Sequence, residues 1–371
     1  MEDLTPADKA RYARHLSLPQ IGEEGQARLK GSRVFAVGAG GLGSPALLYL
    51  AAAGVGHLTI IDDDTIERSN LQRQILHADE DVGSSKVESA MQRLQQLNPA
   101  ITIDVHAIRL TSENALDLLS GHDIVIDGTD NIPTRYLVSD ACELLNIPWV
   151  YGSIYQFEGQ VSVFNLNGGP NYRDLFPTPP PPESGPSCED GGVLGVLPGV
   201  IGSIQATEAI KVLLGIGEPL RGRLLIYDAL DMSMRTLRFS SIERDPVTEL
   251  IDYEGFCGVK PMQMPFAEIS PTQYTGRRQQ GWNPLFIDTR NDMEASIVTL
   301  PDTDLLVPHE DILLVDLPKD RDIVLYCRTG GRSAMAAYAL SQTGHDSSKL
   351  FNLAGGIHAW HAEIDSTVLK Y

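Results

Sequence analysis

The chain has 371 residues, of which 42% are hydrophobic and 21% are charged, and its formal net charge is −20. This length exceeds one ordinary hydrophobic core and the composition is globular, so we expect two domains. The excess of acidic side chains argues against direct binding to a nucleic-acid backbone or an anionic membrane. No uninterrupted apolar stretch is long enough to span a bilayer, and the polar N-terminal segment lacks the pattern of a signal peptide. Four cysteines in so long a chain do not make a disulfide framework, so we expect the reducing cytoplasm.

The first half of the sequence alternates short apolar runs with helical patterns. It predicts strands at 33–37, 57–61, 101–107 and 123–127, and helices at 44–53 and 83–98. Such a series implies an α/β fold in which helices cover both faces of a mostly parallel sheet. Further along, the patterns predict antiparallel strands over 149–164, a helix at 200–214, and strands at 224–227 and 234–239. The Pro- and Gly-rich residues 178–186 are predicted to lack regular structure.

A glycine-rich sequence follows the first strand and opens a helix. It reads Gly38-Ala39-Gly40-Gly41-Leu42-Gly43. This G-x-G-x-x-G pattern lets the backbone approach a phosphate chain, and the helix N-terminus favours negative charge. Asp62 ends the next strand, where a carboxylate can hold ribose hydroxyls. These residues alone predict a Rossmann-like domain, with an NAD-dependent dehydrogenase as the default interpretation.

The residues that follow Asp62 do not fit hydride transfer. Segment 62–74 gathers acids, an amide and arginines, Lys86 begins the next predicted helix, and Asp130 and Asn131 follow the strand at 123–127. Arginine and lysine neutralise charge that develops on phosphates, and an aspartate at a strand end can hold Mg²⁺. The cluster therefore favours phosphoryl or nucleotidyl transfer, and the NAD-dependent enzyme becomes the weaker alternative.

Residues 1–255 resemble the MoeB/ThiF group of ubiquitin-activating-type adenylyltransferases. The resemblance is clearest in two stretches, Ser69-Asn70-Leu71-Gln72-Arg73-Gln74 and Gly202-Ser203-Ile204-Gln205-Ala206-Thr207-Glu208-Ala209. It implies that the chain uses ATP and Mg²⁺ to adenylate the C-terminal Gly-Gly carboxylate of a ubiquitin-like sulfur carrier. It also implies that Asp130 is the Mg²⁺ ligand. The residues that match the ATP-contacting positions of the family are Gly41, Asp62, Ser69, Asn70, Leu71, Gln72, Arg73, Lys86, Asp130 and Asn131.

The same resemblance assigns roles to two more residues. Arg14 matches an arginine that the family supplies across a dimer interface to the neighbouring subunit's ATP, which implies a homodimer. Without the family, Arg14 would be interpreted as a solvated charge on a helix. Cys188 matches a catalytic cysteine that forms a thioester or acyl disulfide with the carrier, or resolves one. Cys142 and Cys257 lie in sequences that favour a structural role.

One departure from the family concerns a metal. Many members hold a structural zinc ion with two Cys-x-x-Cys pairs. Asn171 and Asp174 stand where the first pair would fall, and residues 244–247 contain no cysteine where the second would lie. Because both pairs are missing, we predict that no zinc is bound there. The sequence does not indicate what braces this region instead.

The C-terminal part predicts a second, smaller α/β domain with strands at 285–288, 323–326 and 349–353. Cys327 follows the second of these strands and precedes a glycine-rich loop and a helix. Backbone N–H groups, a helix N-terminus and the fixed charge of Arg332 would stabilise a thiolate there and make it a nucleophile.

Residues 265–371 resemble a single rhodanese domain, although segment 291–304 lacks the family's usual Gly-His-Ile-Pro-Gly-Ala stretch. From Cys327 to Arg332 the spacing is Cys-x4-Arg, one residue shorter than in cysteine phosphatases. The narrower loop suits a persulfide sulfur better than a phosphate. An inactive rhodanese-like interaction module is the alternative interpretation.

Together these features predict three regions. They are an ATP-binding adenylation domain at 1–255, a linker and domain entry at 256–275, and a rhodanese-like sulfurtransferase domain at 276–371. The first domain would form an acyl-adenylate on the carrier. A persulfide on Cys327, supplied by a cysteine desulfurase or thiosulfate, would then attack the acyl carbon. Release, with Cys188 as a candidate thiol, would leave a thiocarboxylate for molybdopterin, thiamine, cysteine or tRNA-thiolation pathways.

One further alternative remains open at this point. The chain could be a modifier-activating enzyme, in which Cys188 holds a thioester and passes the modifier to a conjugation partner.

Overall fold

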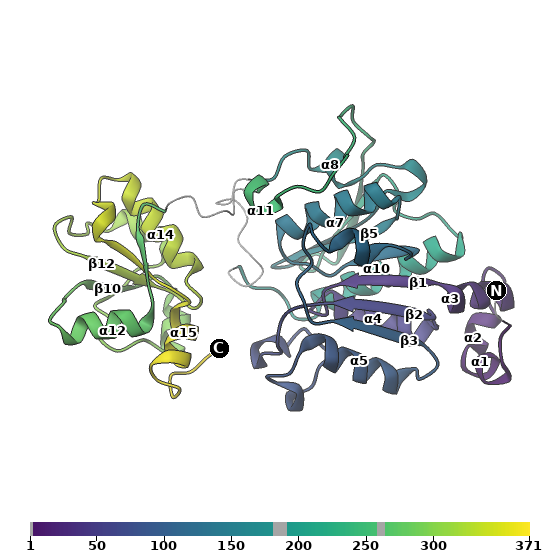
Figure 1. Cartoon of the computed structure of the whole chain (residues 1–371), viewed down its shortest axis with the longest axis horizontal. Coiled ribbons are helices and arrows are strands. Elements are labelled where there is room, and N and C mark those ends of the chain that lie inside the picture. Colours follow the sequence, from purple (N-terminus) through teal and green to yellow (C-terminus); the bar gives the residue numbers. More distant parts are fainter. Residues whose placement is uncertain (1–2, 181–190, 258–263) are drawn as a thin grey trace. The chain divides into compact units, whose positions relative to one another are not determined.

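The computed structural model describes residues 3–180, 191–257 and 264–371. It divides the chain into two compact units, Met1–Lys260 and Pro261–Tyr371 (Figure 1). The boundary falls inside the predicted linker at 256–275.

Unit 1 is built on an eight-stranded sheet with the order β3-β2-β1-β4-β5-β6-β7-β8. The first five strands in this order are parallel, and β6, β7 and β8 continue the sheet in antiparallel pairing. This confirms the predicted α/β fold with a mostly parallel sheet. The strands are β1 (Arg33–Val37), β2 (His57–Ile61), β3 (Thr102–His106), β4 (Ile124–Asp127), β5 (Trp149–Tyr155), β6 (Glu158–Phe164), β7 (Arg223–Asp228) and β8 (Ser233–Arg238).

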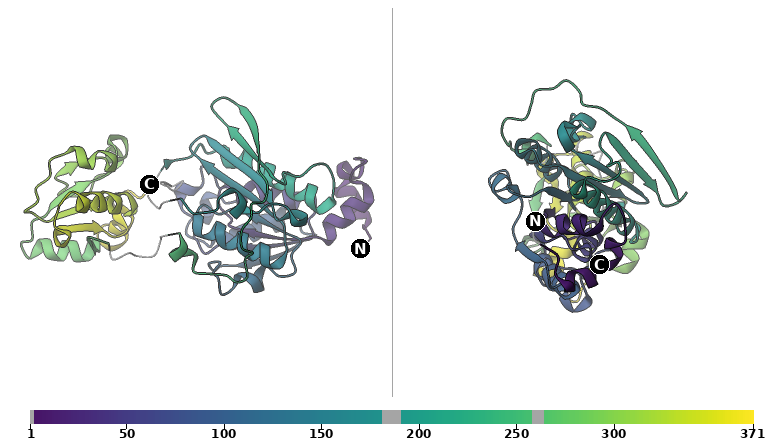
Figure 2. Two further views of the ribbon diagram at one scale, coloured as in Figure 1. Left: turned by 90° about the horizontal axis from the view of Figure 1, so that it is seen from above. Right: turned by 90° about the vertical axis from the view of Figure 1, so that its right-hand side faces the viewer.

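Helices cover both faces of this sheet, as Figures 1 and 2 show. The longer helices are α3 (Gly22–Gly31), α4 (Gly43–Ala53), α5 (Lys86–Leu97), α7 (Ile132–Leu145) and α10 (Leu197–Leu214). The shorter ones are α1 (Pro6–Arg11), α2 (Ala13–Leu16), α6 (Ala115–Leu119), α8 (Tyr172–Leu175), α11 (Tyr253–Phe256), η1 (Arg68–Asn70), η2 (Asp79–Asp81) and η3 (Leu166–Gly168).

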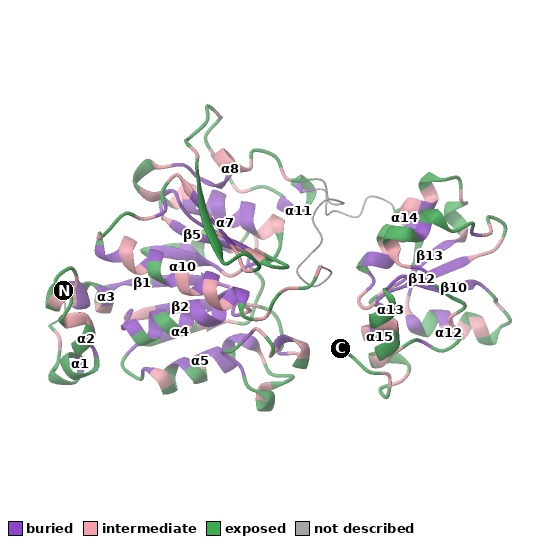
Figure 3. Cartoon of the chain, turned by 180° about the vertical axis from the view of Figure 1, so that it is seen from behind, coloured by how far each residue is buried: buried purple, intermediate pink, exposed green. Residues whose placement is uncertain are grey.

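Alternate residues of strand β1 pack into two separate hydrophobic clusters, one on each face of the sheet. Val34 and Ala36 of β1 join a cluster with α4, α5 and α10, whereas Phe35 and Val37 join a cluster with α6 and α7. A strand buried on both faces needs a continuous apolar sequence, which β1 has. At the other edge, β8 is exposed throughout (Figure 3).

Helix α10 is the one helix among the described residues that is long and apolar enough to cross a membrane. Glu208 and Lys211 interrupt its apolar sequence, so it is not the uninterrupted apolar stretch that the sequence was predicted to lack. Its 18 residues have a mean hydropathy of 1.2, which meets the length and composition of a membrane-spanning helix. However, 56% of it is buried, and it packs against α4 and β5. The helix therefore occupies the position of a core helix of unit 1.

Unit 2 has a five-stranded parallel sheet with the order β11-β10-β12-β13-β9. Its strands are β9 (Ala267–Ile269), β10 (Leu285–Asp288), β11 (Leu305–Leu306), β12 (Ile323–Tyr326) and β13 (Leu350–Leu353). Its helices are α12 (Pro271–Gln279), α13 (Asp292–Ile297), η5 (His309–Leu314), α14 (Gly331–Gln342), η6 (Ser347–Lys349) and α15 (Gly356–Glu363). Strand β9 and the start of α12 lie within 256–275, so this part of the predicted linker belongs to the fold of unit 2.

Candidate functional site

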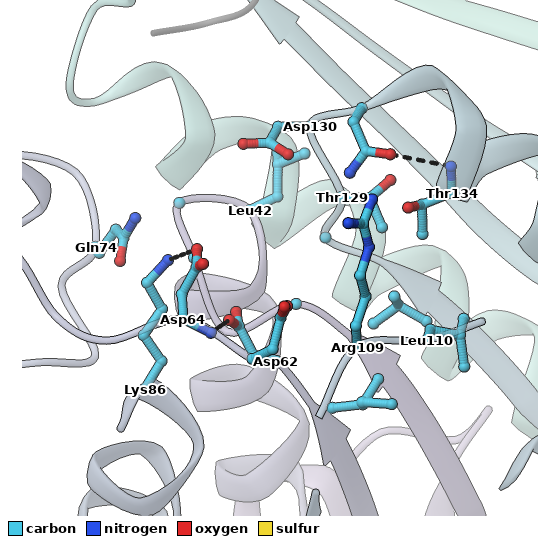
Figure 4. Close-up of a pocket in the computed structure, with 18 of the residues that line it drawn as sticks. Leu42, Asp62, Asp64, Gln74, Lys86, Arg109, Leu110, Thr129, Asp130 and Thr134 are labelled. Carbon is cyan, nitrogen blue, oxygen red and sulfur yellow. Dashed lines mark hydrogen bonds and ion pairs between the residues drawn. The ribbon is translucent and has the colours of Figure 1, made fainter. Parts of the chain in front are cut away.

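A cavity of about 300 Å³ lies at the carboxyl edge of the sheet in unit 1. Strand β1 stands between β2 and β4 there, and ligands of open α/β sheets bind where the strand order reverses in this way. The lining includes six of the ten residues predicted to contact ATP, namely Gly41, Asp62, Arg73, Lys86, Asp130 and Asn131. The lining also includes residues without a predicted role, namely Arg135 and six that Figure 4 labels, Asp64, Gln74, Arg109, Leu110, Thr129 and Thr134.

The glycine-rich loop requires its glycines at two positions. Gly38 has a φ of +97°, and a Cβ there would lie 2.8 Å from the carbonyl oxygen of Gly128. At Gly43, the first residue of α4, a Cβ would lie only 2.2 Å from the carbonyl oxygen of Gly38. The loop therefore passes tightly beside the end of β4, and the N-terminus of α4 begins at the cavity, as an anion-binding site requires.

Asp62 connects the end of β2 to this loop. One carboxylate oxygen accepts a hydrogen bond of 2.8 Å from the N–H of Ala39, and the other accepts one of 2.9 Å from the N–H of Asp64. Burial raises the pKa of Asp62 above its ordinary value, and the charge of Lys86 opposes that shift. The carboxylate is thus fixed in place at the position predicted to hold a ribose.

Lys86 begins α5 and brings a buried positive charge to the cavity. Its residue is 6% exposed, and Nζ forms an ion pair of 2.6 Å with Asp64 (Figure 4). A buried ammonium group is costly unless it is paired, which explains the conformation of Asp64. Within the described residues, Asp62, Asp63 and Asp64 form the one group of three or more potential metal ligands in which one oxygen from each side chain lies within 4.8 Å of the others.

Asp130 and Asn131 follow β4 on the other side of the cavity. Asp130 is exposed, and its carboxylate has no partner among the described residues, so it is available to a cation. The side-chain oxygen of Asn131 accepts a hydrogen bond of 3.0 Å from the N–H of Thr134 and thereby caps α7. Asn131 therefore has a structural role at the rim in addition to the one the resemblance implies.

Four predicted residues do not line the cavity. The buried Asn70 accepts a hydrogen bond of 3.1 Å from the N–H of Glu67, and the Ser69 hydroxyl donates to the Glu67 carboxylate at 3.3 Å. The carbonyl of Ser69 in turn accepts a hydrogen bond of 3.2 Å from Arg73. These contacts order η1 so that Arg73 reaches the cavity. The four predicted residues that do not line the cavity are Ser69, Asn70, Leu71 and Gln72.

A buried ion pair that was not predicted from the sequence lies beneath the cavity. Asp127, the last residue of β4, is fully buried and lies 3.9 Å from the guanidinium of Arg135. Thr129 donates two hydrogen bonds to one of its oxygens, at 2.9 Å from the N–H and 2.6 Å from the hydroxyl. Burial raises the pKa of Asp127 to about 6, against the opposing charge of Arg135. A charged residue ending an otherwise apolar strand was the available sequence signal.

Two predicted catalytic residues are not part of this cavity. Arg14 is exposed on α2 and does not line the cavity of its own chain. Cys188 lies outside the described residues. Cys142 is fully buried, and burial raises the pKa of its thiol well above the ordinary value. Burial also raises the pKa of Cys257 to about 11, and both thiols have the surroundings of inert, structural cysteines.

In unit 2, Cys327 directly follows β12 and is fully buried. Its Sγ accepts hydrogen bonds from the N–H of Gly330 at 3.1 Å and from the Ser333 hydroxyl at 3.5 Å. Gly330 has a φ of +97°, and helix α14 begins immediately after it. The predicted order of strand, glycine loop and helix is confirmed. Backbone and hydroxyl donors are thus directed at the sulfur.

We expected the charge of Arg332 to stabilise a thiolate at Cys327, but its terminal nitrogens do not point at that sulfur. They form hydrogen bonds of 2.7 and 2.6 Å with the two oxygens of Glu294 on α13. Burial raises the pKa of Glu294, but the contacts with Arg332, a hydrogen bond from the backbone N–H of Asn291 and the charge of Arg290 together lower it by more, so the net direction is downward. Nearby, Arg290 is fully buried and paired with Asp288.

Comparison with known proteins identifies two families along the chain. Residues 12–247 match the ThiF family, and residues 271–363 match the rhodanese-like domain. The chain is 47% identical to the probable adenylyltransferase/sulfurtransferase MoeZ of Mycobacterium tuberculosis, over 99% of this chain and 96% of the relative. It is 44% identical to the adenylyltransferase and sulfurtransferase MOCS3 of Anopheles gambiae, over 96% and 87%.

Two further comparisons concern unit 1. The sulfur carrier protein adenylyltransferase of Thermus thermophilus is 54% identical, over 69% of this chain and 99% of the relative. A crystal structure of E. coli MccB with ATP superposes with a TM-score of 0.56 at 21% identity, over 64% of this chain and 73% of that one. At that identity the superposition supports the fold alone. The chain belongs to the ThiF family and carries a rhodanese-like domain C-terminal to its ThiF domain in the sequence.

Proposed function

We propose that this chain adenylates the C-terminal carboxylate of a ubiquitin-like sulfur carrier and converts it to a thiocarboxylate. The observation that carries the proposal is the presence in one chain of the polar cavity of unit 1 and the Cys327 loop of unit 2. Support comes from MoeZ and MOCS3, whose names state both activities and which align with nearly the whole chain.

The adenylation step would use the cavity of unit 1. Asp62 would hold the ribose of ATP, and the glycine loop and the N-terminus of α4 would receive its phosphates. A carboxylate oxygen of the carrier attacks the α-phosphorus, the bond to the β-phosphate oxygen breaks, and pyrophosphate leaves. Arg73 and Lys86 would neutralise the charge that develops on the phosphates. The carboxylate of Asp130 would hold Mg²⁺, which shields phosphate charge when bound.

The sulfur-transfer step would use Cys327. The terminal sulfur of its persulfide attacks the acyl carbon, the bond from that carbon to AMP breaks, and AMP leaves. The product is an acyl disulfide on Cys327. A second thiol then attacks the sulfur of Cys327, which forms a disulfide between the two cysteines and releases the carrier thiocarboxylate. Cys188 is the candidate for this second thiol, and an external thiol would later reduce the disulfide.

Several finer features belong to the same proposal. We propose a cytoplasmic homodimer in which Arg14 of each chain serves the ATP of the other, because Arg14 is exposed and lies away from its own cavity. A cysteine desulfurase or thiosulfate would supply the sulfur. Molybdopterin biosynthesis is one of the pathways that such a carrier would serve.

The test combines the full-length protein with ATP, Mg²⁺, thiosulfate and a carrier that ends in Gly-Gly. Mass spectrometry of the carrier should show replacement of one oxygen by sulfur, and absence of that change refutes the proposal. Cys327→Ala should lose the thiocarboxylate but keep ATP–pyrophosphate exchange, whereas Cys257→Ala, a matched control, should keep both.

Two outcomes would contradict this division of labour. Loss of exchange in Cys327→Ala would show that the two units do not act separately. A DTT-sensitive carrier adduct that persists on Cys188 in Cys327→Ala would instead indicate a modifier-activating enzyme.

A further inference from the structure

Three segments of unit 1 meet through polar side chains at the C-terminal end of α7. They are the last turn of α7, helix α8 and segment 242–247, which follows β8. We refer to the contacts among them as the polar clasp, whose side chains are Glu143, Asn171, Asp174 and Arg244. Asn171, Asp174 and the segment around Arg244 are the positions at which the sequence comparison above placed cysteine pairs.

Arg244 is the centre of the polar clasp. Its guanidinium lies 2.6 Å from a carboxylate oxygen of Glu143 and 3.4 Å from one of Asp174. Each acid also binds the backbone of the same segment. Asp174 accepts a hydrogen bond of 3.1 Å from the N–H of Ile242, and Glu143 accepts one of 3.2 Å from the N–H of Val247. One cation and two anions therefore fasten segment 242–247 to both α7 and α8.

Asn171 adds a fourth contact and orders α8. Its side-chain nitrogen donates to Glu143, and its side-chain oxygen caps α8 by accepting from the N–H of Asp174 at 3.2 Å. The N–H of Asn171 in turn donates to the Asp174 carboxylate at 2.8 Å. This reciprocal capping box satisfies the helix start within the polar clasp itself.

The polar clasp is largely removed from water. The Asp174 and Arg244 side chains are 5% and 22% exposed, and that of Glu143 is 20% exposed. Burial lowers the pKa of Arg244, but the hydrogen bond and charge of Glu143 and the charge of Asp174 raise it by more, so the net direction is upward. Without the guanidinium, two partly dehydrated carboxylates would face each other with no cation between them.

These side chains do not fit a structural zinc site. Such a site takes four thiolate, imidazole or carboxylate ligands, usually with cysteine among them. The polar clasp has two carboxylates and no cysteine or histidine, and a guanidinium, which cannot be a ligand, contacts both acids. In the described part of the chain, the group of three acids that could hold a metal lies elsewhere, at Asp62 to Asp64.

We propose that the polar clasp is a metal-free brace in which Arg244 takes the place of a structural cation. It holds α8 and segment 242–247 against α7, and unit 1 needs no zinc for its stability. One turn earlier on α7, Asp140 extends the same seam. It forms two hydrogen bonds of 2.7 Å with Arg173 and accepts one of 2.7 Å from Tyr253 on α11.

The first test measures metal in the full-length protein. Purified from zinc-containing medium, it should contain far less than one zinc per chain by elemental mass spectrometry, and a chelator should leave its melting temperature unchanged. Stoichiometric zinc whose removal lowers the melting temperature of unit 1 would overturn the proposal.

The second test removes the cation. Arg244→Met should lower the melting temperature of unit 1 by roughly 4–8 °C, since breaking a mostly buried ion pair costs more than a surface pair. Arg235→Met is the matched control, because Arg235 is 69% exposed and 3.5 Å from Glu158. The control should shift the melting temperature by less than about 2 °C.

Hydrogen exchange separates the polar clasp from general destabilisation. In Arg244→Met, peptides covering 171–175 and 242–247 should exchange faster, whereas peptides covering 33–53 should exchange at the wild-type rate. Adding Glu143→Gln to Arg244→Met should restore part of the lost melting temperature, because it removes one of the two facing carboxylates. Wild-type exchange and melting in Arg244→Met would refute the bracing role.

Discussion

Asp127 offers the most quantitative prediction, because its environment disfavours its charge. It is fully buried at the end of β4, and one of its oxygens accepts both hydrogen bonds from Thr129. The other oxygen makes no hydrogen bond, and the guanidinium of Arg135 lies 3.9 Å from it. Burial therefore raises the pKa of this carboxyl to about 6 despite Arg135.

This pKa fixes the sign of a contribution to stability. The carboxyl of Asp127 has a pKa of 3.8 in the unfolded chain and about 6 in the folded chain. Between these two pH values, Asp127 holds a proton in the folded chain that it has lost in the unfolded chain. The free energy of unfolding therefore falls as pH rises between about 4 and about 6, and becomes constant above that window. At 1.36 kcal/mol per pKa unit, the difference amounts to ~3 kcal/mol. Asp127→Asn should remove this dependence, whatever fixed cost the substitution adds.

The assay compares urea unfolding of wild type and Asp127→Asn at several pH values between about 4 and about 7.5. Pulse proteolysis with mass spectrometry of peptides from unit 1 keeps its unfolding separate from that of unit 2. The difference in unfolding free energy between the two proteins should change by ~3 kcal/mol across the window, with the variant gaining relative to wild type as pH rises. A constant difference would refute the reasoning, and so would a change of the opposite sign.

Three other substitutions test the sites directly. Lys86→Met should reduce ATP–pyrophosphate exchange by roughly 10²-fold or more, because it removes the buried cation of the cavity, while sulfur transfer from thiosulfate to cyanide continues. Gly43→Ala places a Cβ 2.2 Å from the carbonyl oxygen of Gly38 and should lower the stability of unit 1 by roughly 1–3 kcal/mol in thermal unfolding. Glu294→Gln should release Arg332 from its ion pair. Because thiosulfate is a dianion, the freed arginine should lower the KM for thiosulfate in the same cyanide assay. An unchanged KM would show that this ion pair does not limit donor binding.

The features that sequence predicted well are local ones. The glycine loop and the Cys327 loop each follow an apolar strand and precede a helix, so adjacent residues determine their geometry, and Asp62 directly follows the apolar strand β2. The strands at 33–37, 57–61, 285–288 and 323–326 were predicted with the bounds that the structure has. In each case the information lies in the apolar run and in the residue that ends it, which is Gly38, Asp62, Asp288 or Cys327.

Contacts between distant segments were not predictable in this way. Lys86 is paired with Asp64, and Arg332 with Glu294, 38 positions away, because tertiary structure brings them together. Strand β9 falls in the region predicted to be a linker and domain entry. Its three residues form a strand only by pairing with β13, which the local sequence does not show. A single sequence shows which charges exist but not which of them neutralise one another.

That distinction decides what each glycine loop can bind. Both units place a glycine loop and a helix N-terminus at the carboxyl end of a parallel strand, β1 in one and β12 in the other. In unit 1, Arg73 and Lys86 add positive charge to the cavity lining, which suits the several charges of a triphosphate. In unit 2 the terminal nitrogens of Arg332 bind Glu294, which leaves the N–H of Gly330 and a hydroxyl as the donors to Cys327. Two such donors match one thiolate or persulfide sulfur, and a phosphate at this loop would meet the carboxylate of Glu294 beside its arginine.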